Sequence, residues 1–194
     1  MPVLALVPAL ALAACGGGDT EAAPTTTAQP TTSTTTTTTT EVEVDVTSVP
    51  EEIDEAYVQA VVDRFDVLLQ EAYAAAMASG TFDGDFEARL RALYGGLEAE
   101  RLLENLRRVG TEPFADPPGL PTTTVLDVMT ARRDCIFLTA ERDLTPLSDE
   151  TYEQVQPYYL QLVAATPGPL NETPWVLARD VYFADGAQLG DQCA

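Results

Sequence analysis

Apolar residues recur at helical spacing in the segment that follows position 50. One face of the predicted helix carries Ile53, Tyr57, Val61, Leu68, Ala72 and Met77. Ser48-Val49-Pro50-Glu51 has the form of a capping box, so we expect the helix to begin there. Gly80 marks its expected end, because glycine readily adopts the left-handed conformation that terminates many helices. The same spacing predicts two shorter helices, over residues 86–94 and 97–109.

The pattern changes from helix to strand after a proline-rich segment. Residues 111–121 hold four prolines, which exclude both a helix and a central strand. β-branched and apolar residues then predict four strands, over residues 122–130, 135–141, 154–165 and 175–184. Three N-terminal helices followed by an antiparallel meander predict an α+β fold, in which a curved four-stranded sheet packs over the three helices.

The N-terminal residues 1–14 are apolar and carry no charged side chain. At about 1.5 Å rise per residue they are too short to cross a hydrocarbon layer of about 30 Å, and they are typical of a secretory signal. The run ends in Leu12-Ala13-Ala14-Cys15, which resembles the lipobox of bacterial lipoproteins. This resemblance implies that residues 1–14 are a signal peptide and that the thiol of Cys15 carries a lipid. No Lys or Arg precedes Cys15, so we expect the true start to lie upstream.

A threonine-rich segment separates Cys15 from the predicted domain. Residues 16–47 contain 14 Thr and almost no aliphatic side chains before Val42. Such a segment has too little apolar surface to offset the entropy of ordering, so we expect residues 15–47 to form a lipid-anchored, disordered tether. Threonine-rich stalks are often glycosylated in secreted proteins, and an unmodified spacer is an equal alternative. The α+β domain then spans residues 48–194.

Net charge and the absence of His exclude several classes of function. The chain has 31 acidic and 10 basic residues, no His, and a formal net charge of −21. Without His, catalysis by a Ser-His-Asp or Cys-His arrangement and His-ligated zinc are excluded. A strongly acidic chain is also a poor partner for nucleic acid, because that affinity depends on basic groups. We predict no metal and no cofactor.

Two cysteines remain when Cys15 is assigned to the lipid anchor. An exported protein enters an oxidising compartment, where a remaining pair of thiols most simply forms a disulfide. We therefore predict a bond between Cys135 and Cys193, which would tie the C-terminal tail to the second predicted strand.

The order of the elements is similar to the cone-shaped fold of the nuclear transport factor two and ketosteroid isomerase superfamily. The closest local likeness lies in residues 175–186, which open with Trp175 and close with Gly186. The resemblance implies a pocket between the concave face of the sheet and the helices. Related ketosteroid isomerases and polyketide cyclases place an inward Asp in this pocket as a general base.

Two carboxylates are candidates for this inward position. Asp127 alternates in phase with Val125 and Met129, and Asp180 alternates in phase with Val176, Ala178 and Tyr182. A buried carboxylate with a raised pKa would suit general-base catalysis. The alternative is that each faces solvent or pairs with an arginine such as Arg179 or Arg132.

No nucleophile-base pair and no metal-ligand set is evident in the sequence. We therefore expect a lipid-anchored protein on the extracytoplasmic side of a bacterial cell membrane, with a non-catalytic domain that binds a small apolar ligand or another envelope protein. The alternative is an isomerase-like or cyclase-like enzyme that uses Asp127 or Asp180 as its base. A purely structural spacer would instead have a filled core without a cavity.

Overall fold

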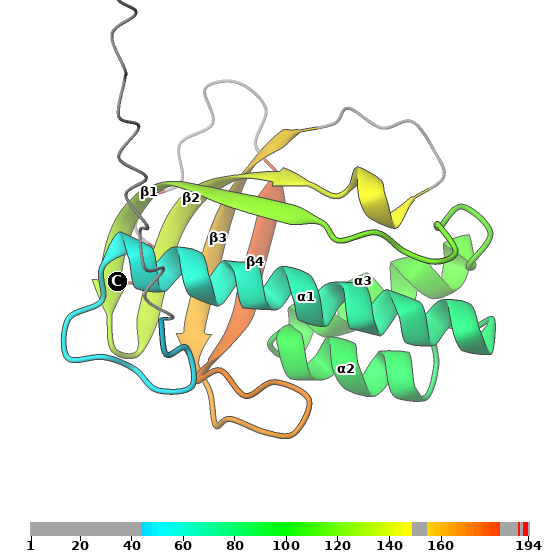
Figure 1. Ribbon diagram of the computed structural model, residues 1–194, viewed down its shortest axis with the longest axis horizontal. Coiled ribbons are helices and arrows are strands. Elements are labelled where there is room, and N and C mark those ends of the chain that lie inside the picture. Colours follow the sequence, from blue (N-terminus) through cyan, green and yellow to red (C-terminus); the bar gives the residue numbers. More distant parts are fainter. Residues whose placement is uncertain (1–43, 149–154, 183–189, 191, 194) are drawn as a thin grey trace, which may run out of the picture. The chain divides into compact units, whose positions relative to one another are not determined.

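The computed structural model describes residues 44–148, 155–182, 190 and 192–193. The chain divides into two units, Met1–Thr40 and Glu41–Ala194, and every described residue belongs to the second unit. The predicted signal peptide, Cys15 and most of the predicted tether lie outside the described residues. The elements of the domain are α1 (Glu55–Ser79), α2 (Asp85–Leu93), α3 (Gly96–Val109), β1 (Thr122–Arg132), β2 (Cys135–Asp143), the 3₁₀ turn η1 (Thr145–Leu147), β3 (Gln156–Ala164) and β4 (Trp175–Tyr182) (Figure 1).

The domain has the predicted α+β architecture. Three helices precede an open sheet of four antiparallel strands in the order β1-β2-β3-β4. Figure 1 shows α1 running along one face of the curved sheet, with α2 and α3 beside it. The predicted strands agree with the observed ones to within two residues at every described end. Within the described residues, no helix has both the length and the hydropathy that crossing a bilayer demands.

The first helix begins later than its sequence predicts. The prediction of a capping box at Ser48 is wrong, because Asp54 is the N-cap of α1. A carboxylate oxygen of Asp54 accepts a hydrogen bond from the backbone N–H of Tyr57 at 2.8 Å. The Ser48 hydroxyl instead donates to Asp45 at 2.9 Å. Asp54 therefore supplies the acceptor that the first turn of the helix needs.

The ends of the helices follow their glycines more closely. Gly80 has a φ of 70° and donates its N–H to the carbonyl of Ala76, so it ends α1 as predicted. The predicted second and third helices correspond to α2 and α3, and each differs from its prediction by a single residue at its ends.

The main core lies between α1 and the face of the sheet that it covers. Ile136, Leu138 and Ala140 alternate along β2 and are fully buried in this core. Trp175, at the start of β4, is also fully buried, and its indole N–H donates to the hydroxyl of Tyr57 at 2.8 Å. This bond satisfies the polar atom that a buried Trp carries and links the last strand to the first helix.

The opposite face of the sheet carries a second, smaller core. The sulfur atoms of Cys135 and Cys193 are 2.00 Å apart, which confirms the predicted disulfide. Phe137 and Tyr159 stack beside it with ring centroids 5.6 Å apart. The side chain of Gln161 donates to the carbonyl of Gln192 at 2.7 Å. The C-terminal tail is therefore fastened to the outer face of the sheet, away from the helices.

Three β-bulges interrupt the regular alternation of the sheet, two in β1, at Leu126 and Met129, and one in β4. In β1, Val125 pairs with Ala140 and Asp127 pairs with Thr139, so Leu126 has no partner. In β4, Arg179 pairs with Gln161 and Leu177 pairs with Leu162, so Ala178 has no partner. An extra residue in one strand moves every later side chain to the opposite face. The bulges at Leu126 and Ala178 therefore decide which way Asp127 and Asp180 point.

Candidate functional site

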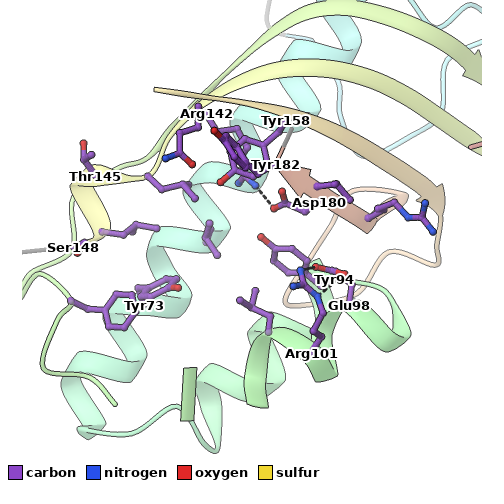
Figure 2. Close-up of a pocket in the computed structure, with 18 residues that line it drawn as sticks. Tyr73, Tyr94, Glu98, Arg101, Arg142, Thr145, Ser148, Tyr158, Asp180 and Tyr182 are labelled. Carbon is purple, nitrogen blue, oxygen red and sulfur yellow. Dashed lines mark hydrogen bonds and ion pairs between the residues drawn. The ribbon is translucent and has the colours of Figure 1, made fainter. Parts of the chain in front are cut away.

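A pocket of about 660 Å³ lies between the helices and the sheet (Figure 2). Its wall combines side chains of α1, α3, β2, β3 and β4 with the segment 144–148. The resemblance to the cone-shaped fold implies a pocket in this place. The volume is in the range of pockets that hold a small organic molecule.

One side of the pocket is apolar. Leu69 and Tyr73 of α1, Leu102 of α3, Phe114 and Leu147 line it. The rings of Tyr73 and Phe114 pack with centroids 5.0 Å apart. These side chains belong to the hydrophobic core or pack against it, so the apolar wall is a continuation of the core that is left open to the pocket.

The other side is polar and is built around Arg142. In β2, Arg142 continues the inward alternation of Ile136, Leu138 and Ala140, so the pleat of the strand points it at the helices. Its side chain is only 5% exposed. A buried guanidinium needs partners, because leaving one unpaired away from water is costly.

The partners of Arg142 come from α1, β1 and β4, and Tyr94 also forms a side-chain hydrogen bond with it. Its Nη1 donates to Oδ2 of Asp180 at 2.5 Å, and its Nε donates to the hydroxyl of Thr123 at 3.2 Å. Its Nη2 lies 3.7 Å from Oδ1 of Asp66. Thr123 in turn donates its hydroxyl proton to Asp66 at 2.9 Å. One guanidinium thus lies between two carboxylates.

Asp180 occupies the inward position that the sequence predicts, but for a different reason. Before the bulge at Ala178, Leu177 faces the core; after it, Asp180 pairs with Leu160 and lines the pocket. The predicted phase with Val176 and Ala178 is therefore wrong, because the bulge reverses it. The ion pair predicted with Arg179 or Arg132 forms with Arg142 instead.

Asp127 does not reach the pocket. It is exposed and pairs with Thr139 on the face of β1 away from the core. The inward prediction for Asp127 is wrong, since the bulge at Leu126 turns it outward relative to Val125. The exposed alternative that the sequence also allows is the observed one.

Burial sets the protonation behaviour of the polar side. Burial raises the pKa of Asp180, the nearby Glu98 carboxylate adds to the rise, and Arg142 opposes it. Burial likewise raises the pKa of Asp66, against Arg142 and the hydrogen bond from Thr123. Burial alone would lower the pKa of Arg142, but Asp180 and other neighbours raise it, so the guanidinium stays charged.

One oxygen of Asp180 has no hydrogen-bond partner. Oδ1 is buried, and no donor among the described residues contacts it. Figure 2 shows the carboxylate beside Arg142 and Tyr94, with Glu98 and Arg101 beyond Tyr94. The phenol of Tyr94 stays protonated, because burial raises its pKa far above neutrality. A buried acceptor without a donor needs an explanation, and a water molecule or an ion from outside the protein is one.

Sequence reasoning missed Arg142, Asp66 and Tyr94. Arg142 lies one residue beyond the predicted end of its strand, and extending the alternation of Ile136, Leu138 and Ala140 by one step would have found it. Tyr94 is the C-cap of α2, a position that carries no pattern of its own. Asp66 lies on α1 among apolar residues and carries no signal beyond being a charge on a buried face.

Other kinds of site receive no support from the geometry. Across the described ranges, no three acidic or cysteine side chains are grouped so as to hold a metal ion. The chain matches no protein-family model, no curated protein and no solved structure. Function is therefore inferred from the pocket itself.

Proposed function

We propose that this domain binds a small, largely apolar molecule in the pocket between its sheet and its helices. The proposal includes its setting: a protein anchored through a lipid on Cys15 to the extracytoplasmic side of a bacterial cell membrane. The observation that carries it is a pocket of about 660 Å³ with one apolar and one polar side. A purely structural spacer would instead have a filled core without a cavity.

Two features support the setting. The Leu12-Ala13-Ala14-Cys15 sequence resembles a lipobox, and Cys135 and Cys193 form the disulfide expected of an exported protein. Mass spectrometry of the native protein tests this part directly. It should find a chain that begins at a diacylated Cys15, and an intact leader on an unmodified thiol would contradict it.

A pocket-filling variant tests the binding function. Leu102 lines the pocket from α3, so Leu102→Trp should fill part of the space and weaken binding of an environment-sensitive dye such as N-phenyl-1-naphthylamine at least about tenfold. Leu97→Trp is the matched control, because Leu97 is on the same helix and is 89% exposed. Equal dye binding by both variants and the wild type would place the dye elsewhere and contradict the proposal.

The second candidate function is an enzyme of the isomerase or cyclase type with Asp180 as general base. The observation in its favour is that Asp180 lines the pocket and has a raised pKa. Binding is preferred because it needs only the pocket, whereas Asp180 is already held in an ion pair with Arg142.

Hydrogen exchange separates the two functions. A general base that acts on carbonyl compounds would speed the exchange of the α-hydrogens of a bound ketone, such as cyclohexanone, with D₂O. We expect the wild type to give the buffer rate. Acceleration that disappears in Asp180→Asn would support the enzyme instead.

A further inference from the structure

We infer that the natural ligand carries a protonated amine at one end of an apolar body, and that the amine binds beside Asp180. The inference rests on the proposed function, since it assumes that the pocket binds a small molecule. It adds the chemical class of that molecule. Three features of the pocket support it: the charges around Asp180, the donor that Asp180 lacks, and the aromatic rings beside it.

The charges that face Asp180 do not balance. Arg142 of β2 contacts Asp66 of α1 and Asp180 of β4, so one positive charge meets two carboxylates. Glu98 and Arg101 of α3 form an ion pair with each other and cancel. When Asp66 and Asp180 are ionised, the group therefore has a net charge of −1.

Arg179 does not remedy this imbalance, although it lies next to Asp180 in β4. Consecutive residues of a strand point to opposite faces, and Arg179 is exposed. Its Nη1 donates to the side-chain oxygen of Gln192 in the C-terminal tail at 2.5 Å. Besides these charged residues, the pocket is lined by the polar side chains Tyr94, Thr145, Ser148, Gln156, Tyr158 and Tyr182, none of which is an Arg, Asp or Glu.

Oδ1 of Asp180 also lacks a hydrogen-bond donor among the described residues, and the protein cannot readily supply one. The guanidinium of Arg142 already serves Oδ2 of Asp180 and the hydroxyl of Thr123, and it lies against Asp66. The side chain of Asp180 is 12% exposed, and rotation of a carboxylate about its last bond is soft. An ammonium in the pocket would supply both the missing donor and the missing charge.

Aromatic rings surround the same place. Tyr158 and Tyr182 pack with ring centroids 6.0 Å apart, and Arg142 lies 5.6 Å from the centre of the Tyr158 ring. Figure 2 shows these rings and that of Tyr94 close to Asp180, while Tyr73 lies on the other side of the pocket. Ring faces attract cations, so the rings favour the amine and the apolar side holds its hydrocarbon.

An anionic ligand fits the pocket less well. The side chain of Arg142 is nearly inaccessible at 5% exposure, and Arg101 is paired with Glu98. A carboxylate would therefore meet the carboxylate of Asp180, and the guanidinium of Arg179, which also lines the pocket, is hydrogen-bonded to the side chain of Gln192. The net charge of −21 on the whole chain acts in the same direction, since it draws cations to the molecule and repels anions.

Three probes with one hydrocarbon chain test the inference on the full chain with its disulfide intact. Octylamine, octanol and octanoate are titrated against bound N-phenyl-1-naphthylamine at about pH 7.5, where the amine is charged. We expect octylamine to bind tightest, at least about tenfold tighter than octanoate. In Asp180→Asn, octylamine should lose about tenfold in affinity while octanol changes less than about threefold.

Asp127→Asn is the matched control, because it removes the same charge from an exposed position of the sheet. It should leave the order of the three probes unchanged. If Asp180→Asn does not fold, Glu98→Gln replaces it, because it leaves the positive charge of Arg101 near Asp180 without its ion-pair partner. This variant should weaken octylamine several-fold relative to octanol.

Each result has a separate meaning. Tighter binding of octanoate, equal binding of octanol and octylamine, or an amine preference that survives Asp180→Asn would overturn the inference and leave the proposed function standing. If the dye and all three probes fail to bind, the proposed function itself fails.

Discussion

Arg142 joins three parts of the fold that lie far apart in the sequence. It is in β2, and its guanidinium contacts Asp66 in α1, Thr123 in β1 and Asp180 in β4. Removing one member of a buried charged group leaves the others unpaired in a medium of low dielectric. The polar side of the pocket is therefore also a determinant of stability.

The variant Arg142→Met tests this role. It keeps much of the side-chain volume but leaves Asp66 and Asp180 without their cation. We expect the free energy of unfolding to fall by about 3–5 kcal/mol, measured by urea denaturation. Arg108→Met, at an exposed position of α3, should cost less than about 0.5 kcal/mol. A similar small loss at Arg142 would contradict the account.

Stability should also respond to pH through Asp66 and Asp180. The pKa of each is raised in the folded protein, so folding favours their protonated forms. Their contribution to stability is fully present below the unfolded pKa of about 3.8 and is lost as pH rises through the folded pKa. Asp134 and Glu172, whose pKa values are lowered, act in the opposite direction, mainly at more acidic pH.

We therefore expect the urea midpoint to be higher at about pH 5 than at about pH 7.5. Asp180→Asn should reduce this difference, because an amide does not titrate. Asp127→Asn, on the exposed face of β1, should leave most of the difference between the two urea midpoints. A midpoint that falls between pH 7.5 and pH 5 in the wild type would show that other groups dominate.

At the scale of elements, the sequence predicts where helices and strands lie much better than which way single strand residues point. Helical spacing and prolines place all three helices and four strands, because these patterns extend over many residues. The direction of Asp127 and Asp180 depends on one extra residue in each of β1 and β4. Neither Leu126 nor Ala178 is a residue type that signals a bulge.

The start of α1 shows the same limit. Ser48 and Asp54 both offer a capping side chain ahead of the apolar stripe, and local sequence does not rank them. The structure selects Asp54, while the carbonyl of Ser48 accepts from the hydroxyl of Tyr57 at 2.9 Å. That hydroxyl also accepts from Trp175, a contact between residues 118 positions apart that no local pattern reveals.

Gln59 gives a prediction at the same scale, because it covers the outer edge of β1. Its side-chain nitrogen donates to the carbonyl of Thr123 at 2.7 Å, and its oxygen accepts from the N–H of Val125 at 2.8 Å. At an exposed edge strand, these backbone groups would be free to hydrogen-bond with a strand of another chain. The side-chain amide of Gln59 thus replaces a neighbouring strand.

Gln59→Ala should lower the free energy of unfolding by about 1–3 kcal/mol and promote self-association, measured by light scattering after gel filtration. Gln70→Ala is the control: Gln70 is on the same helix and donates to the carbonyl of Pro118, outside the sheet. It should destabilise the protein without promoting association. Association of both variants to the same extent would show that the edge of β1 is not the cause.

For the whole molecule, the two faces of the sheet have separate roles. The inner face and the helices enclose the pocket, and the outer face holds the disulfide and the C-terminal tail. The sequence alone predicts the disulfide, because compartment and cysteine count suffice for it. The sequence alone does not predict the polar side of the pocket, because its residues come from α1, β1, β2 and β4 and meet only in the folded chain.

The most direct test of the account is to locate bound octylamine by nuclear Overhauser effects in the full chain. The account predicts contacts from its head group to the rings of Tyr94, Tyr158 and Tyr182, and from its chain to Tyr73 and Phe114, all of which line the pocket. Contacts confined to Phe137 and Tyr159 on the outer face, or none at all at saturating amine, would contradict it.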